Sequence, residues 1–135
     1  DLRLACAHFY CGDAMESPYK GKTGLKRVWN ALFYSFDGLA AAFRHEDAFR
    51  QELLLACILI PAALYLPVDV TSKCLMIASI ISVLVVELLN SGIEAVTDRV
   101  SLEDHALAKR AKDLGSAAVL LSIANVIIVW TLALA

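Results

Sequence analysis

The sequence predicts an all-α integral-membrane protein, with three transmembrane helices preceded by an amphipathic helix at the membrane surface. Hydrophobic residues make up 59% of the 135-residue chain, above the roughly 45–50% that is usual for soluble domains. The mean hydropathy is +0.66. The apolar residues are concentrated in three blocks of helical length, and a stripe of apolar residues at helical spacing precedes the first block. A chain of this length forms one domain.

The predicted surface helix covers about residues 24–44. Its apolar side chains recur at steps of three and four residues, which places them along one face of a helix. They are Leu25, Val28, Trp29, Leu32, Phe36, Leu39 and Phe43. Lys26, Arg27 and Asp37 lie off that stripe. Aromatic residues on one face and basic residues on another favour a helix at the membrane surface. Packing against a soluble partner remains the alternative.

The predicted spans cover about residues 48–67, 73–97 and 113–135. A bilayer core of about 30 Å requires roughly 20 helical residues. The block Leu114–Ala135 supplies 22 residues without a charge, whereas the second block reaches this length only if its helix carries Glu87 and Asn90 into the interface. The alternative is a soluble helical bundle, which is disfavoured because so short a chain has little polar surface to cover three apolar helices.

The distribution of basic residues predicts the topology. Six lie in Lys20–Arg50, one in Pro67–Lys73 and four in Arg99–Lys112. The positive-inside rule therefore places the first and third segments in the cytoplasm. A net charge of −2 gives no reason to expect a nucleic-acid partner. Residues 1–14 fit none of these elements; we expect them to be an extension, with residues 15–135 forming a single membrane-embedded domain.

Four polar residues interrupt the second apolar block. Around a helix with about 100° per residue, Glu94 and Asp98 lie roughly 20° to either side of Glu87, and Asn90 lies about 60° from Glu87 on the same side as Glu94. All four therefore share one face. Carboxylates in or near a bilayer are costly and usually face a bundle interior or a watery cleft with a function.

Further polar residues stand at the mouths of the other two spans. Glu46 and Glu52 lie at the mouth of the first span, and Lys112, Asp113 and Ser116 lie at the mouth of the third. The topology places all of these residues at the cytoplasmic end, where they can converge with the carboxylates of the second span.

Three kinds of function agree with these polar residues. Carboxylates suit Mg²⁺ bound with substrate phosphates, a lysine can stabilise phosphate charge, and a further carboxylate can accept a hydroxyl proton. A cation or proton pathway also places acids in membranes. Polar residues can, finally, simply hold helices together. The residues alone leave these three functions open.

Three motifs identify a resemblance. "AFRQE" (48–52), "ELLNSGIEAVTDR" (87–99) and "RAKDLGSAAVL" (110–120), in this order and spacing, closely resemble the prokaryotic diacylglycerol kinase family. The resemblance extends from about Lys22 to the C-terminus. It implies a homotrimer in the bacterial inner membrane, with composite active sites between subunits on the cytoplasmic side. These sites would use ATP with Mg²⁺ to phosphorylate membrane diacylglycerol to phosphatidic acid in lipid recycling.

Two alternatives to this activity remain. Relatives in the same superfamily phosphorylate undecaprenol, so the resemblance leaves that lipid open. A small cation or proton carrier is the alternative from another functional class.

The resemblance also implies roles for individual residues. Glu87 would be the catalytic base, Glu46 and Glu94 would hold the metal, and Asn90 would support them. The residues implied to bind ATP are Arg27, Tyr34, Glu46, Glu94, Glu103, Asp104, His105, Lys112 and Asp113. Those implied to bind the lipid are Arg27, Ser35, Phe36, Phe49, Gln51, Glu52, Glu87 and Ser116.

Two further interpretations concern polar residues outside these sets. Asn125, in the middle of the third span, is interpreted as an interhelical hydrogen-bonding residue. Asp98 and Arg99 are interpreted as an ion pair at the end of the second span.

Overall fold

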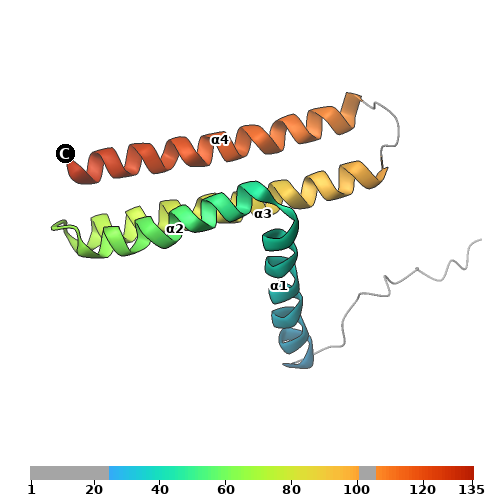
Figure 1. Ribbon diagram of the computed structural model, residues 1–135, viewed down its shortest axis with the longest axis horizontal. Coiled ribbons are helices and arrows are strands. Elements are labelled where there is room, and N and C mark those ends of the chain that lie inside the picture. The colour runs from blue at the N-terminus through green and yellow to red at the C-terminus, as the bar shows by residue number, and fades with distance from the viewer. Residues whose placement is uncertain (1–24, 101–105) are drawn as a thin grey trace, which may run out of the picture. The chain divides into compact units, whose positions relative to one another are not determined.

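The computed structural model describes residues 25–100 and 106–135, which form four helices. In chain order these are α1 (Leu25–His45), α2 (Asp47–Tyr65), α3 (Val70–Val100) and α4 (Ala106–Leu134) (Figure 1). The described residues contain no β-strand. The predicted all-α fold is therefore confirmed.

Three of these helices have the length and composition needed to cross a membrane. They are α2, α3 as far as Arg99, and α4. Each reaches or exceeds 18 residues and carries few charges within its most apolar stretch, so a bilayer core of about 30 Å can be spanned. The prediction of three transmembrane helices is confirmed.

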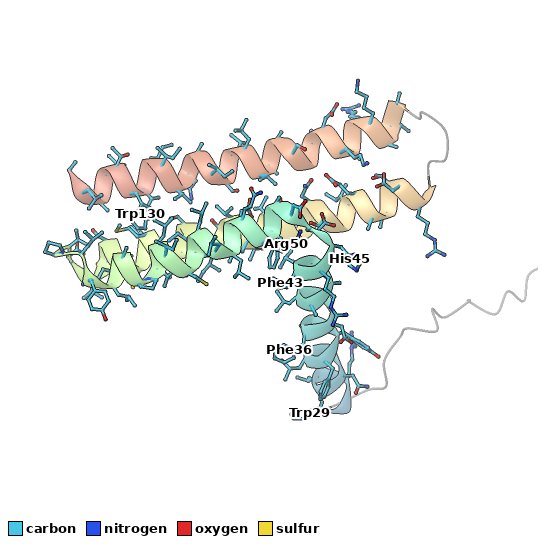
Figure 2. All side chains as sticks on the ribbon, viewed as in Figure 1. Trp29, Phe36, Phe43, His45, Arg50 and Trp130 are labelled. Atoms are coloured by element: carbon cyan, nitrogen blue, oxygen red, sulfur yellow. The ribbon has the colours of Figure 1, made fainter. Side chains whose placement is uncertain are left out.

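The chain divides into two structural units, residues 1–36 and 37–135. The described part of the first unit is the N-terminal half of α1. From Val28 on, its large apolar side chains are exposed, and Trp29 is 62% exposed; Figure 2 labels Trp29 on this helix. The rings of Trp29 and Phe33 lie edge to face, with centroids 5.6 Å apart, an arrangement that aromatic pairs prefer. Exposed aromatic residues suit the predicted membrane surface, and the location of α1 there remains a prediction.

In the second unit, α3 packs against both α2 and α4 (Figure 1). The buried residues of α2 are Phe49, Ala56 and Ala63, spaced by seven. Two of the three are alanines, and small side chains allow membrane helices to approach each other closely.

The buried face of α3 changes character along its length. Met76, Ile80 and Val83 are buried at steps of four and three residues, the spacing of one helical face. The next position in this series is Glu87, which is only 4% exposed. The apolar core of the second unit therefore leads directly into a buried carboxylate.

Helix α2 ends before the predicted residue 67. Leu66 has φ −63° and ψ 142°, an extended conformation that residues before a proline favour, and Pro67 follows. Lys73 donates from Nζ to the Leu64 carbonyl at 2.8 Å, and so satisfies one of the carbonyls that a helix end leaves free.

Helix α3 begins with a side-chain cap. Asp69 Oδ1 accepts hydrogen bonds from the N–H groups of Thr71 at 2.8 Å and Ser72 at 3.1 Å. The Ser72 hydroxyl donates to Asp69 Oδ2 at 2.5 Å. These hydrogen bonds, the Ser72 hydroxyl first, lower the pKa of Asp69. Because that pKa is lowered on folding, the cap contributes at neutral pH and is lost as the pH falls through the lowered pKa.

Candidate active site

A pocket of about 280 Å³ lies at the point where the apolar core becomes polar. Its lining residues are Glu46, Ala48, Glu87, Asn90, Glu94, Ser116 and Val119. They come from the residue before α2, from α2, from α3 and from α4. The structure therefore brings five of the predicted site residues together.

Glu46 reaches this pocket because of its backbone conformation. It is the single residue between α1 and α2, with φ −110° and ψ 111°, and it stands at the N-cap of α2. An N-cap side chain often turns back to the free N–H groups of its own helix. The Glu46 side chain makes no such hydrogen bond, which leaves its carboxylate available to the pocket.

Glu87, Asn90 and Glu94 reach the pocket from one face of α3, as their spacing predicted. Asn90 Nδ2 donates to Glu94 Oε1 at 3.4 Å. The Oδ1 atom of Asn90 is buried and has no hydrogen-bond partner among the described residues. Buried carboxylates and amides are costly unless they are paired, so this face is suited to a cation or a polar ligand.

Gly115 of α4 makes room for Asn90. Gly115 is buried, and a Cβ atom added there would overlap Asn90 Oδ1 and lie 3.3 Å from Asn90 Cγ. A residue larger than glycine would have to displace the amide. Gly115 therefore fixes the distance between α3 and α4 beside the pocket.

The carboxylates of the pocket fit a metal ion that arrives with a substrate. In residues 25–100 and 106–135, no three His, Cys, Asp or Glu side chains form a group that could hold a metal. Mg²⁺, however, is usually bound by one or two carboxylates together with substrate phosphates. Glu46 and Glu94, which line the pocket, supply hard oxygen donors of the required kind.

Lys112 and Asp98 form an ion pair beside this region. Lys112 Nζ of α4 lies 2.6 Å from Asp98 Oδ1 of α3. Asp98 thus pairs across two helices, and the interpretation of an ion pair with Arg99 is wrong. Sequence reasoning missed this partner of Lys112, although it had placed Asp98 on the same face as Glu87. Asp113 is exposed and does not line the pocket.

Some residues predicted to contact the lipid lie elsewhere in the second unit. Glu52 lines a separate apolar cavity of about 160 Å³ between α2, α3 and α4, and its Oε2 is buried without a partner among the described residues. Phe49 is 3% exposed and belongs to the core of a single chain, whereas Gln51 is exposed. None of these three lines the carboxylate pocket.

The remaining predicted residues belong to other parts of the chain. Arg27, Tyr34, Ser35 and Phe36 lie in the first structural unit and are exposed. Ser35 Oγ donates to the Ala31 carbonyl of its own helix at 2.9 Å. The roles of these four residues remain predictions. The residues expected to meet the nucleoside, Glu103, Asp104 and His105, lie outside the described residues.

Comparisons of the sequence with known proteins all point to the same family. The profile of the prokaryotic diacylglycerol kinase family matches residues 33–134. A diacylglycerol kinase of Pseudomonas aeruginosa is 54% identical over 114 residues, covering 84% of this chain and 93% of the relative. The diacylglycerol kinase of Haemophilus influenzae is 48% identical over 80% of this chain and 92% of its own.

The diacylglycerol kinase of Escherichia coli is 46% identical over 112 residues, or 83% of this chain and 92% of the relative. The motifs around the pocket, the three long apolar helices and these matches agree with one another. The chain belongs to the prokaryotic diacylglycerol kinase family.

Proposed function

We propose that this protein transfers the γ-phosphoryl group of ATP to the free hydroxyl of membrane 1,2-diacylglycerol. The products are phosphatidic acid and ADP, and the activity returns the lipid to phospholipid synthesis. The observation that carries the proposal is the pocket that joins Glu46, Glu87, Asn90, Glu94 and Ser116 at the end of an apolar core. A lipid hydroxyl and a water-soluble nucleotide can meet only where apolar and polar surroundings meet.

Glu87 is the proposed catalytic base. Its carboxylate accepts the proton of the lipid hydroxyl while the hydroxyl oxygen forms a bond to the γ-phosphorus. The bond from the γ-phosphorus to the bridging oxygen breaks, and ADP leaves with the electron pair. Glu87 is buried at the boundary between Val83 of the core and Asn90 of the pocket, which suits a base that acts on a lipid.

The other polar residues would hold the nucleotide. Glu46 and Glu94 are proposed to hold Mg²⁺ together with the ATP phosphates, and Asn90 orients Glu94 through its amide. When bound, Mg²⁺ neutralises charge on the phosphates. Lys112 would supply a further positive charge to the phosphates, and Asp98 holds its ammonium group near the start of α4.

We further propose that the pocket faces the cytoplasm of a bacterial cell, from the inner membrane. Arg44 and Arg50 flank Glu46, and Lys109, Arg110 and Lys112 begin α4. The opposite end of the second unit, between α2 and α3, has Lys73 alone. This asymmetry supports a cytoplasmic pocket by the positive-inside rule.

A homotrimer is the proposed assembly. The residues of one chain do not fully enclose the pocket, and α4 exposes Asn125 in the middle of its apolar stretch. Lipid tails cannot form hydrogen bonds with these polar groups, so their exposure to lipid costs free energy. Contact with a second copy of the chain would remove that cost.

Transfer of radiolabelled phosphate from ATP in detergent micelles tests the activity. We expect label in phosphatidic acid when diacylglycerol is supplied, and little label when undecaprenol replaces it. Preferential labelling of undecaprenol would assign the protein to the polyprenol kinases. Cation or proton flux in vesicles without any ATP consumption would instead support a carrier.

A further inference from the structure

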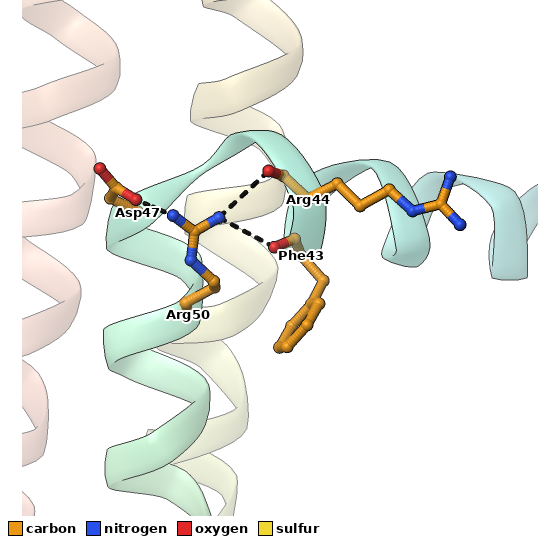
Figure 3. A network of polar contacts seen from close by, with 4 residues as sticks. All are labelled: Phe43, Arg44, Asp47 and Arg50. Atoms are coloured by element: carbon orange, nitrogen blue, oxygen red, sulfur yellow. Dashed lines mark hydrogen bonds and ion pairs between the residues drawn. The ribbon is translucent and has the colours of Figure 1, made fainter.

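Arg50 binds the last turn of α1 from its position in the first turn of α2. Its Nη1 donates to the carbonyl oxygens of Phe43 at 3.0 Å and Arg44 at 3.2 Å (Figure 3). Its Nη2 donates to the Asp47 carboxylate. The carbonyls at the end of a helix lack partners within that helix, and a cation there also interacts favourably with the helix dipole. One guanidinium thus satisfies the end of α1 and a side chain of α2.

Glu46 lies between the groups that Arg50 joins. The Glu46 N–H donates to the Ala42 carbonyl at 2.9 Å, and the Glu46 carbonyl accepts the Arg50 N–H at 3.3 Å. The backbone of Glu46 is therefore bonded to both helices, and the Arg50 side chain connects the same two helices around it. Rotation of this peptide would have to break these hydrogen bonds together.

Arg44 provides a contrast at the same junction. Its side chain is exposed and makes no hydrogen bond or ion pair within the part of the chain that the structure describes. Arg44 therefore contributes only its charge to the junction, whereas Arg50 contributes its charge and also connects α1 to α2 through hydrogen bonds.

We infer that Arg50 is a positioning residue for Glu46, holding the α1–α2 junction so that the Glu46 carboxylate faces the pocket shared with Glu87, Asn90 and Glu94. The inference rests on the proposed function, in which Glu46 helps to hold Mg²⁺ with ATP. Arg50 itself lines neither the carboxylate pocket nor the apolar cavity. Loss of Arg50 should therefore affect the use of the metal and nucleotide more than the use of the lipid.

The chemistry of arginine explains why a lysine could only partly replace it. A guanidinium is a planar fork with five N–H donors, whereas an ammonium group is a compact charge on a flexible stem. Lysine at position 50 can keep one carbonyl contact and the charge. It cannot reproduce the two-sided arrangement that Arg50 makes with Phe43, Arg44 and Asp47.

The experiment compares Arg50→Gln and Arg50→Lys with Arg44→Gln, which removes the same charge from the same junction. The Mg²⁺ concentration for half-maximal phosphorylation and the KM for diacylglycerol are measured for each. Binding of Mn²⁺ with a non-hydrolysable ATP analogue is followed separately by electron paramagnetic resonance on the purified protein in detergent. This second measurement does not require turnover.

We expect Arg50→Gln to raise the Mg²⁺ requirement and weaken Mn²⁺ binding by about 10–100-fold, the usual effect of losing a partner of a metal ligand. The KM for diacylglycerol should change little, Arg50→Lys should be intermediate, and Arg44→Gln should match the wild type. In a Glu46→Gln background, Arg50→Gln should add little, because the two residues act through one ligand.

Equal Mg²⁺ requirement and Mn²⁺ binding in Arg50→Gln and Arg44→Gln would overturn the inference. If Arg50→Gln does not fold, Arg50→Lys decides: wild-type Mg²⁺ and Mn²⁺ values would overturn the inference, and raised values would support it. If the wild-type protein transfers no phosphate to lipid, the proposed function fails, and the Mn²⁺ measurement still tests Arg50.

Discussion

Glu87 occupies a position where the packing of α3 would otherwise take an apolar side chain. It continues the buried series Met76, Ile80 and Val83 and is almost fully enclosed. A buried carboxylate usually reduces stability. A catalytic role therefore explains best why a carboxylate stands at this position, and substitution of this one residue tests that role.

Glu87→Gln should retain the fold and nucleotide binding but lose lipid phosphorylation. Glutamine has nearly the same shape and can still form hydrogen bonds, but it cannot accept the proton, and general-base help is worth about 10²–10⁴-fold in rate. The rate of phosphate transfer to diacylglycerol is measured. A variant that keeps more than about a tenth of the wild-type rate would exceed the residual activity expected from that range. The role of base would then pass to another carboxylate, and Glu52 would be tested first.

Lys112→Met should raise the KM for ATP while leaving the assembly intact. The Lys112–Asp98 pair is substantially exposed, so it contributes little to stability, and its effect should appear in the use of the nucleotide. Lys109→Met is the matched control, because Lys109 is exposed one turn earlier on α4. Steady-state kinetics at varied ATP distinguish the two variants. Equal ATP kinetics would remove Lys112 from the phosphate site.

At the scale of the helices, the sequence predicted the order and number of elements because each has its own periodicity. The start of α4 was harder to predict from the sequence, since Ala106–Lys112 is charged and lies outside the predicted span 113–135. These residues include alanine, leucine, lysine and arginine, which are strong helix formers, and they extend α4 by about two turns ahead of the predicted span. Apolar blocks in the sequence identify the part of a helix that lies in lipid. Whether the helix continues into the flanking turns depends on the helix propensity of the residues there.

The sequence could not predict how the helices are aligned along one another. Helical geometry placed Glu87, Asn90 and Glu94 on one face of α3, and the structure confirms that they line one pocket. Whether Glu52 or Ser116 would join them depends on how far each helix slides along α3. That distance is set by contacts such as Gly115 against Asn90, which join residues far apart in the sequence.

Gly115→Ala should destabilise the protein and reduce activity together. The added methyl group overlaps the Asn90 amide, and overpacking of this kind costs about 1–3 kcal/mol. Displacement of Asn90 should also release Glu94 and raise the Mg²⁺ requirement. Thermal unfolding in detergent and Mg²⁺-dependent activity are the measurements.

Gly38→Ala is the control for this substitution, because nothing lies within 4 Å of a Cβ atom added there. In α1 that change should be neutral or stabilising, by up to about 1 kcal/mol, since alanine is the better helix former. Equal effects of the two substitutions would show that the Gly115–Asn90 contact has no special role.

At the scale of the whole molecule, the polar side chains in the apolar part of α4 differ in how they are satisfied. The Ser122 hydroxyl donates to the Val119 carbonyl, and the Thr131 hydroxyl donates to the Ile127 carbonyl, each at 2.7 Å. Asn125 is exposed and has no partner in the part of the chain that the structure describes. Lipid tails offer no hydrogen bonds, so the Asn125 amide favours contact with a second copy of the chain.

Asn125→Leu should therefore weaken the proposed trimer in mild detergent. Hydrogen bonds between membrane helices contribute about 0.6 kcal/mol on average and at most about 1.7 kcal/mol, so the trimer should dissociate at a lower concentration of a denaturing detergent. Thr131→Val is the matched control, because its hydroxyl is already satisfied within α4. Mass measurement across a detergent titration gives the dissociation midpoint of each variant. A trimer that becomes more stable in Asn125→Leu would show that Asn125 faces lipid, and an active monomer in the wild type would remove the trimer altogether.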